Sequence, residues 1–217
     1  TVNLDVDLFN LGGGSSQNLN LVLSSTDQYI TIIDSLETVS SINSNQTITT
    51  ANAFIFQIAD LVPDQHVAIF QLNISDNQGN IWNSNINVTL NSPILNHISF
   101  TVNDLILGNG NGKLDAGENL ELIVEVNNTG HADAYNLTAN LSSLSSYITL
   151  NSSSASLPIL NTTQSQIVSF NITVDNNTPV GTNIIFPFNI NDQIYSYQTD
   201  FSEFAGEINE DYESGDF

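Results

Sequence analysis

The sequence predicts an all-β chain made of two tandem copies of one sandwich module. Three observations support this prediction. Long stretches of the chain repeat, and short segments alternate apolar with polar residues, as strands with one buried face do. Clusters of Gly, Asn, Asp, Ser and Pro separate these segments, and the high Asn, Ser and Thr content argues against helices.

The repeat covers most of the chain. Residues 8–32 align with residues 126–150 at an offset of 118. Further along, the offset becomes 116, where residues 70–76 meet residues 186–192. The matched positions include Asn10 with Asn128, Gly12 with Gly130 and Tyr29 with Tyr147. One register kept over such lengths indicates two copies of a module of about 100 residues.

Each copy has the pattern of an immunoglobulin-like β-sandwich. Apolar and polar residues alternate at residues 2–8 and 68–74 in the first copy, and at residues 120–126 in the second. About seven short strands with regular turns in about 100 residues are typical of that fold. The chain has no Cys, which excludes the inter-sheet disulfide of antibody domains but not their architecture.

We expect one immunoglobulin-like domain at residues 1–92 and a second at residues 93–206. Residues 91–97 are interpreted as a short joint that Pro93 stiffens. Residues 207–217, with the sequence EINEDYESGDF, are interpreted as an acidic linker to a missing domain.

The two copies are not expected to be equally complete. At the offset of 118, Thr1 corresponds to Asn119. The first domain is therefore predicted to be N-terminally incomplete, without its first strand unless another segment supplies it.

Charge narrows the classes of partner. The 217 residues carry a formal net charge of −22, from 23 acidic residues against a single Lys and no Arg. Nucleic-acid binding needs cationic contacts to phosphates and is excluded, and docking to an anionic membrane surface is disfavoured. No apolar run is long enough to span a membrane. Such an acidic surface attracts divalent cations instead.

A Gly- and Asn-rich loop, GNGNGKLDAGE at residues 108–118, is the best candidate site for a metal ion. Ca2+ is bound by six to eight oxygens from carboxylates, amides and backbone carbonyls, and this segment partly fits an EF-hand-type loop. The residue at the first ligand position would be Leu107, so Asp104 would have to replace it. The predicted ligands are Asp104, Asn109, Asn111, Lys113 through its carbonyl, Asp115 and Glu118. The alternative is a β-turn that carries its carboxylates by chance.

Residues 103–143 around this loop resemble a known family. The run NDLILGNGNGKLDAGENLELIVEVNNTGHADAYNLTANLSS is similar to the immunoglobulin-like domains of large secreted Bacteroidetes proteins, where such domains follow gingipain-like peptidase domains or occur in cell-surface adhesins. The positions that match the loop motif are Asn109, Gly110, Asn111, Gly112, Leu114, Asp115, Gly117 and Glu118. Ala116 departs from it, since the family often has Pro there. The resemblance covers most of residues 94–217 and, through the repeat, residues 1–92 more weakly.

The resemblance implies export by the type IX secretion route, an extracellular or cell-surface location, and a role without catalysis. We therefore expect spacer, stalk or accessory modules whose partners are neighbouring domains of the same polypeptide. A structural Ca2+ is expected to pin the loop and to stiffen the joint between the modules. The alternative is an adhesive module that binds a glycan or protein, or that assembles into a filament by strand addition. An enzyme is not expected.

The three histidines and the single Trp are the other side chains that could have a functional role. His66, His97 and His131 are interpreted as loop or linker residues without a shared site. Trp82 has no evident counterpart in the second copy and is the best aromatic candidate for contact with a ligand.

Overall fold

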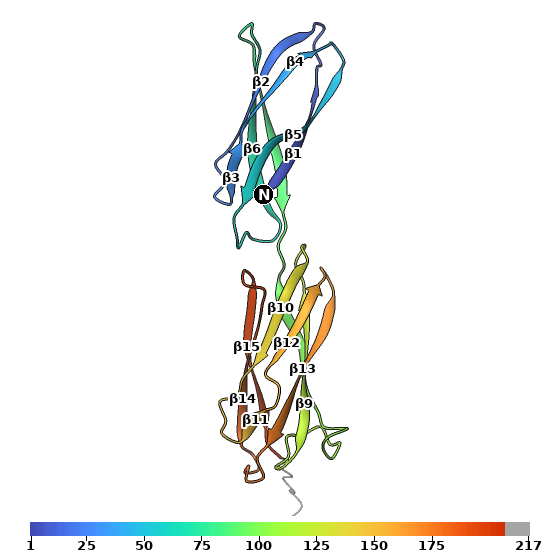
Figure 1. The fold of residues 1–217 in the computed structure, drawn as a ribbon, viewed down its shortest axis with the longest axis vertical. Coiled ribbons are helices and arrows are strands. Elements are labelled where there is room, and N and C mark those ends of the chain that lie inside the picture. Colours follow the sequence, from blue (N-terminus) through green and yellow to red (C-terminus); the bar gives the residue numbers. More distant parts are fainter. Residues whose placement is uncertain (207–217) are drawn as a thin grey trace, which may run out of the picture. The chain divides into compact units, whose positions relative to one another are not determined.

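The computed structural model describes residues 1–206 and confirms the all-β prediction: every regular element in this part of the chain is a strand. The chain divides into two compact units, Thr1–Ser92 and Pro93–Phe217 (Figure 1). The division lies within the segment interpreted as the joint. That segment is shorter than expected, because a strand already begins at Leu95. The predicted acidic linker at residues 207–217 lies outside the described residues.

Unit 2 is a sandwich of two four-stranded sheets. One sheet has the order β11-β13-β9-β8 and the other the order β12-β10-β14-β15. All neighbouring strands are antiparallel. The strands are β8 (Leu95–Asn103), β9 (Asn119–Asn128), β10 (Ala134–Leu141), β11 (Ile148–Leu150), β12 (Ser154–Leu160), β13 (Ser165–Val174), β14 (Asn183–Asn191) and β15 (Ser196–Phe204).

This topology is that of a constant-type immunoglobulin domain with one added strand. In such domains the first, second, fifth and fourth strands form one sheet, and the third, sixth and seventh form the other. Without β12, the strands of unit 2 follow this order, and β12 extends the second sheet beside β10. The predicted immunoglobulin-like sandwich is therefore confirmed in unit 2.

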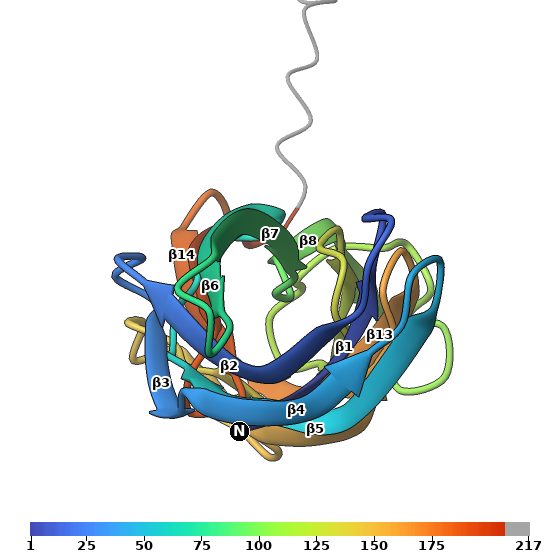
Figure 2. The ribbon, with the colours of Figure 1, turned by 90° about the horizontal axis from the view of Figure 1, so that it is seen from above.

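Unit 1 is the same sandwich with one strand fewer (Figures 1 and 2). Its sheets have the orders β1-β5-β3 and β4-β2-β6-β7, and β8 of unit 2 has no equivalent among residues 1–92. One edge of β1 is consequently unpaired in the described part of the chain. The strands are β1 (Val2–Phe9), β2 (Ser16–Ser25), β3 (Ile30–Asp34), β4 (Leu36–Ile42), β5 (Thr47–Ile58), β6 (His66–Ser75) and β7 (Ile81–Leu90).

A bulge in β5 explains why the repeat offset changes from 118 to 116. In β1 and β5, Leu4 pairs with Phe54 but Val6 already pairs with Thr50, so β5 contains two extra residues at this point. The equivalent ladder between β9 and β13 runs without interruption. Within the bulge, Asn52 has a φ of 52° and its N–H donates to the Asp5 carboxylate at 2.7 Å. Asn tolerates this left-handed backbone conformation better than most residues.

Alternation along the strands builds a separate core in each unit. In β9 every second side chain, from Leu120 to Val126, is fully buried, and Phe170 of β13 and Phe186 of β14 pack against them. In unit 1 the equivalent β1 side chains Val2 and Leu4 are only partly buried.

A buried amide ties the end of β9 to three other segments. Asn128 has no exposed surface. Its Oδ1 accepts hydrogen bonds from the N–H groups of Ile94 and Gly130, both at 3.0 Å. Its Nδ2 donates to the carbonyls of Ala132 at 2.8 Å and Leu160 at 3.2 Å. All four hydrogen-bonding positions of the side-chain amide are thus used, as a buried polar group requires.

Replacing this amide tests its role in unit 2. We expect Asn128→Ala to lower the free energy of unfolding of unit 2 by on the order of 3 kcal/mol, since it leaves buried backbone groups unpaired. Trp82 is the single Trp of the chain, so its fluorescence follows unit 1, whereas circular dichroism follows both units. Chemical denaturation should therefore show an earlier circular-dichroism transition and an unchanged fluorescence transition.

The matched control is Asn10→Ala at the equivalent, half-exposed position of unit 1. It should move the fluorescence transition instead, and by less. An Asn128→Ala protein with an unaltered circular-dichroism curve would contradict the assignment.

Candidate functional site

The candidate metal loop, residues 104–118, joins β8 to β9 and closes one end of unit 2 (Figure 1). Leu114 anchors it in the core with 1% of its surface exposed, and the Leu114 carbonyl accepts the N–H of Gly206 at 2.8 Å. The loop also pairs with the end of β13, where the Val174 N–H donates to the Glu118 carbonyl at 2.8 Å.

This position corrects one expectation. The loop was expected to stiffen the joint around Pro93, yet all of β8 separates it from that joint. It lies beside Ala205 and Gly206 instead, where the chain leaves the described part of the module.

Asp104 organises the loop from its first position. The side chain is 1% exposed, and its two carboxylate oxygens accept the N–H groups of Asn111 at 2.9 Å and Gly112 at 3.1 Å. Its carbonyl accepts the N–H of Gly108 at 2.8 Å. The chain therefore curls back over Asp104, as a replacement of Leu107 in the ligand set requires. Leu107 itself is 54% exposed.

The two Asn side chains point their amide groups at one carboxylate. Asn109 and Asn111 each donate from Nδ2 to the same Oδ2 of Asp115, at 2.7 Å. Their Oδ1 atoms accept the N–H groups of Asn111 at 3.0 Å and Lys113 at 2.9 Å. These bonds set the turns of the loop, and they join four of the six predicted residues into one hydrogen-bonded segment.

The Glu118 carboxylate uses only one of its two oxygens in the hydrogen bonds of the loop. Its Oε1 accepts the N–H of Asn109 at 2.9 Å, whereas its Oε2 is buried and has no hydrogen-bond partner in the described part of the chain. A Cβ added at Gly108 would lie 3.1 Å from this Oε2 and 3.1 Å from the Asp104 carbonyl oxygen. Because residue 108 is a glycine, these two oxygen atoms can both lie close to its backbone.

The donor set fits a hard cation, because every predicted ligand atom is an oxygen. A buried carboxylate oxygen without a partner is unfavourable, and a cation would satisfy it. The carboxylates alone do not suffice: among residues 1–206, no three His, Cys or acidic side chains lie close enough to hold a metal ion. A Ca2+ here would therefore need the amide oxygens of Asn109 and Asn111 and the Lys113 carbonyl in addition to carboxylate oxygens of the loop.

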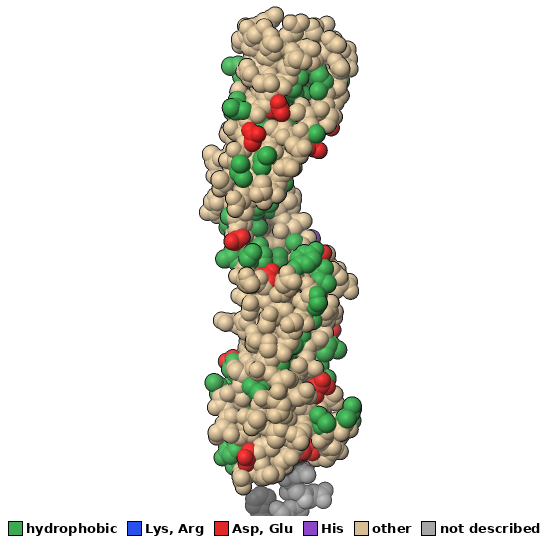
Figure 3. All heavy atoms as spheres, in the orientation of Figure 1, with side chains coloured by type: hydrophobic (Ala, Val, Ile, Leu, Met, Phe, Trp, Pro, Cys, Tyr) green, Lys and Arg blue, Asp and Glu red, His purple; other side chains and the backbone are tan. Residues whose placement is uncertain are grey.

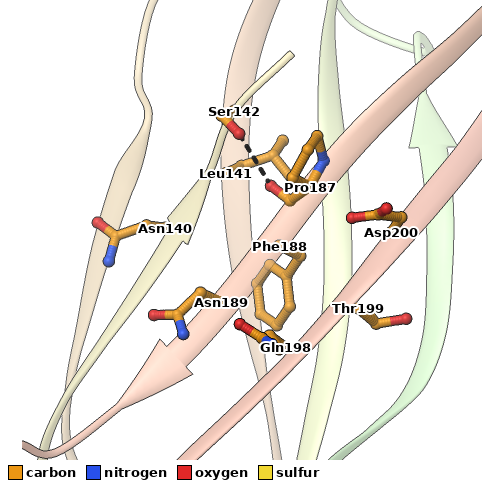
Figure 4. Close-up of a pocket in the computed structure, with 9 residues that line it drawn as sticks. All are labelled: Asn140, Leu141, Ser142, Pro187, Phe188, Asn189, Gln198, Thr199 and Asp200. Carbon is orange, nitrogen blue, oxygen red and sulfur yellow. Dashed lines mark hydrogen bonds between the residues drawn. The ribbon is translucent and has the colours of Figure 1, made fainter. Parts of the chain in front are cut away.

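Unit 2 also has a shallow recess of about 480 Å³ on the sheet that contains β10, β14 and β15 (Figure 4). Its only acidic lining residue is Asp200, and Ser142 donates its hydroxyl to the Pro187 carbonyl at 3.4 Å. No His, Lys or Cys lines the recess, so Ser142 has no base beside it there. On the face shown in Figure 3, acidic side chains are scattered over both units.

Two of the three histidines lie in strands, contrary to the expectation of loop positions. His66 begins β6, and its Nε2 lies 2.7 Å from Oδ2 of Asp27, with the ring edge-on to Tyr29. His97 lies in β8, and its Nδ1 is 2.6 Å from the hydroxyl of Tyr197. Both rings tie strands to neighbouring segments within one unit.

The expectation that Trp82 lacks a counterpart was wrong. In the β6–β7 ladder Trp82 pairs with Ile74, and in the β14–β15 ladder Tyr197 pairs with Ile190. Ile74 and Ile190 are equivalent at the offset of 116, so Trp82 and Tyr197 occupy the same place in the two units. A different hairpin length hides this match in the sequence.

Gly117 is the residue of the loop that tolerates replacement least. Its φ is 86°, and an added Cβ would lie 2.2 Å from Oδ1 of Asn176. We expect Gly117→Ala to destabilise unit 2 by roughly 2 to 3 kcal/mol, through backbone strain and this clash. Gly112→Ala is the control, because φ is 74° but no atom lies within 4 Å, and it should cost about 1 kcal/mol. Equal losses in circular-dichroism melts would contradict the geometry.

The Asp27–His66 pair predicts a pH dependence in unit 1. The Tyr29 N–H and, after it, the His66 ring lower the pKa of Asp27 from its ordinary 3.8, against an opposing effect of burial. A carboxyl with a lower pKa in the folded state contributes stability above its unfolded pKa and loses it as pH falls through the folded pKa. Asp27→Asn should therefore flatten the fall in unit 1 stability from about pH 5 to about pH 2.

The readout is Trp82 fluorescence during denaturation at each pH. Asp60→Asn, an exposed position in the same unit, makes the same change in charge. A profile that both substitutions alter equally would show that overall charge, and not this pair, sets the pH dependence.

Comparison with known proteins finds matches among solved structures only. No family model matches the chain, and no curated protein matches it. Among solved structures, the crystal structure of red sea bream transglutaminase is similar at 10% identity, with a TM-score of 0.36 over 94% of this chain. The chain spans 29% of that enzyme's length. No helix among the described residues is long and apolar enough to cross a membrane.

Proposed function

We propose that the chain is a pair of non-catalytic spacer or accessory modules of an exported multidomain protein, with a structural Ca2+ in the loop of unit 2. The two sandwiches have separate cores, and each places its strands around apolar side chains. The net charge of −22 supports a soluble module and argues against a nucleic-acid partner. The family resemblance of the loop supports export to the cell surface.

The observation that carries the calcium proposal is the unpartnered Oε2 of Glu118. It lies in a loop with two further carboxylates and with Lys113 as the single nearby cationic residue, since the chain has no other Lys or Arg. A bound Ca2+ would supply the missing partner and offset the repulsion among Asp104, Asp115 and Glu118.

The proposed ion would also order the last described residues of the module, 205–206. Leu114 directly follows the candidate ligand Lys113, and its carbonyl accepts a hydrogen bond from the Gly206 N–H. Ordering the loop would therefore also order residues 205–206, where the chain continues toward its next segment. This is the mechanical role that a spacer needs, because it limits bending where one module leads to the next.

A second function, attachment by strand addition, is favoured by one observation. The open edge of β1 exposes the backbone groups of a strand whose equivalent in unit 2 is paired on both sides. Such edges are the usual sites of β-augmentation. This function is compatible with a spacer, since both use the same sandwiches.

Calcium binding is tested by thermal unfolding with excess Ca2+ or with EDTA. Ca2+ should raise the melting temperature of unit 2 by several degrees, since a ligand that binds only the folded state stabilises it. The fluorescence transition of Trp82 in unit 1 should stay in place. Glu118→Gln should remove most of the shift, whereas Asp200→Asn, which removes a charge outside the loop, should keep it. Equal melting curves with Ca2+ and EDTA would rule out a structural Ca2+.

A further inference from the structure

The recess of unit 2 lies on the outer face of the sheet that contains β10, β14 and β15 (Figure 4). Leu141 of β10 and Phe188 of β14 are buried in the core, so the residues on either side of them face outward. These three strands supply outward-facing residues in two rows across the sheet. One row consists of Asn140, Asn189 and Gln198, and the next of Ser142, Pro187 and Asp200.

Pro187 is an unusual residue for the middle of this sheet. β14 is paired on both sides, and a proline has no N–H to donate to a neighbouring strand. The Ser142 N–H donates to the Pro187 carbonyl at 2.9 Å, but Pro187 cannot return the second hydrogen bond of an antiparallel pair. The Ser142 carbonyl is therefore left without its partner in the ladder, at the wall of the recess.

The amide and carboxylate side chains of the recess keep most of their hydrogen-bonding capacity. Among residues 1–206, the side chains of Asn140, Gln198 and Asp200 make no hydrogen bond. Asn189 makes one, in which its Oδ1 accepts Nδ2 of Asn191 at 2.6 Å. Amides offer both donors and acceptors, and a carboxylate offers acceptors. The recess is therefore suited to a ligand whose groups both donate and accept.

The same face of unit 1 carries different side chains. At the repeat offsets, Val22 and Gln71 stand in the places of Asn140 and Pro187. Gln71 has the backbone N–H that Pro187 lacks, and the Val22 side chain has no polar group. The strands of this sheet have the same order in both units, so the fold does not require the arrangement in unit 2.

The amides of unit 1 are bonded to each other. Asn73 is equivalent to Asn189, and the β6–β7 ladder places Asn83 where β15 has Gln198. The Asn73 Nδ2 donates to Oδ1 of Asn83 at 2.8 Å. The corresponding pair in unit 2 has no such bond, which leaves both of its amides accessible to a ligand.

The chemistry of the recess selects an uncharged polar ligand. Asp200 is its single charged side chain, so an anionic ligand would meet no cation and would be repelled. An apolar ligand would cover amides without giving them partners. The volume of about 480 Å³ lies in the range of small-molecule sites. A pyranose sugar meets these conditions, because its hydroxyl groups donate and accept and its C–H face can pack on the Pro187 ring.

We propose that this recess binds a neutral saccharide, with one pyranose ring lying on Pro187. The hydroxyl groups of that ring bond to the three amides of the recess and donate to the Asp200 carboxylate and the Ser142 carbonyl. Binding is weak, because the recess is shallow and its one aromatic residue, Phe188, is 2% exposed. The proposal goes beyond the spacer function and does not depend on calcium binding.

The test is nuclear magnetic resonance of the full, 15N-labelled chain, titrated with glucose, galactose, mannose and N-acetylglucosamine in turn. At least one sugar should shift the amide signals of residues 140–142, 188–189 and 198–200, with a dissociation constant in the millimolar range. The equivalent residues of unit 1, at 22–24, 71–73 and 83–85, should not shift and serve as an internal control.

Two variants test the roles of the side chains. Gln198→Ala should weaken binding of the same sugar at least about fivefold, since it removes one bonded amide. Pro187→Gln, which introduces the residue of unit 1, should weaken it further, because it removes the apolar ring and supplies an N–H to the Ser142 carbonyl. Ser156→Ala, at an exposed position of β12 outside the recess, should leave binding unchanged. Circular-dichroism melting shows that each variant is folded.

Other outcomes would overturn the proposal. The absence of shifts with all four sugars at about 100 mM, or equal shifts in both units, would show that the recess is no saccharide site. Glucuronate that binds as well as glucose would contradict the charge argument. Tighter binding of N-acetyl-lysine amide, lost in Asp200→Asn, would assign the recess to a cationic group of a partner protein instead.

Discussion

The pairing of the β9-type strand with its neighbouring strands is the interaction on which the sandwich depends. In unit 2, β9 lies between β13 and β8, and its alternate side chains from Leu120 to Val126 are completely buried. The same pairing brings Ile94 to the Asn128 amide and sets both ends of the loop at residues 104–118. Among residues 1–206, unit 1 has only the β13-type neighbour of this strand, and its first two apolar positions are less buried.

The candidate metal loop is a consequence of the same pairing. β8 and β9 are antiparallel neighbours, so the chain must reverse between them, and here the reversal is long enough to hold several oxygen donors. Glycines at positions of positive φ make the turns, and the Asp104 carboxylate and the Asn amides fix them. Leu114 joins the loop to the core and to Gly206. The sandwich thus positions the loop. An ion bound in the loop would also affect residues 205–206, through the bond between Leu114 and Gly206.

Much of the fold could be predicted from the sequence because the repeat and the alternation are local signals. The matched Asn10 and Asn128 proved to have nearly the same hydrogen bonds. Other features depend on pairing between distant strands. The equivalence of Trp82 and Tyr197 required the ladder registers, and the position of the loop beside Gly206 required the direction of β8. The change of offset became clear only with the bulge at Asn52.

In the candidate site, too, contacts between residues near in sequence could be predicted, whereas the effects of packing could not. The loop pattern predicted that Asp104 would replace Leu107 by a backward curl of the chain, and its contacts with Asn111 and Gly112 agree with that geometry. Spacing could not predict that one Glu118 oxygen is buried without a partner, because burial of a single atom depends on the packing around Gly108.

The central claim is that β1 and β9 are equivalent strands, one with an open edge and one with a closed edge. Amide hydrogen exchange of the native chain, resolved by residue, tests this most directly. The account predicts strong protection of amides on both edges of β9, but on β1 only for those bonded to β5, with the outward-facing amides exchanging rapidly. Uniform protection along both edges of β1, equal to that of β9, would contradict it.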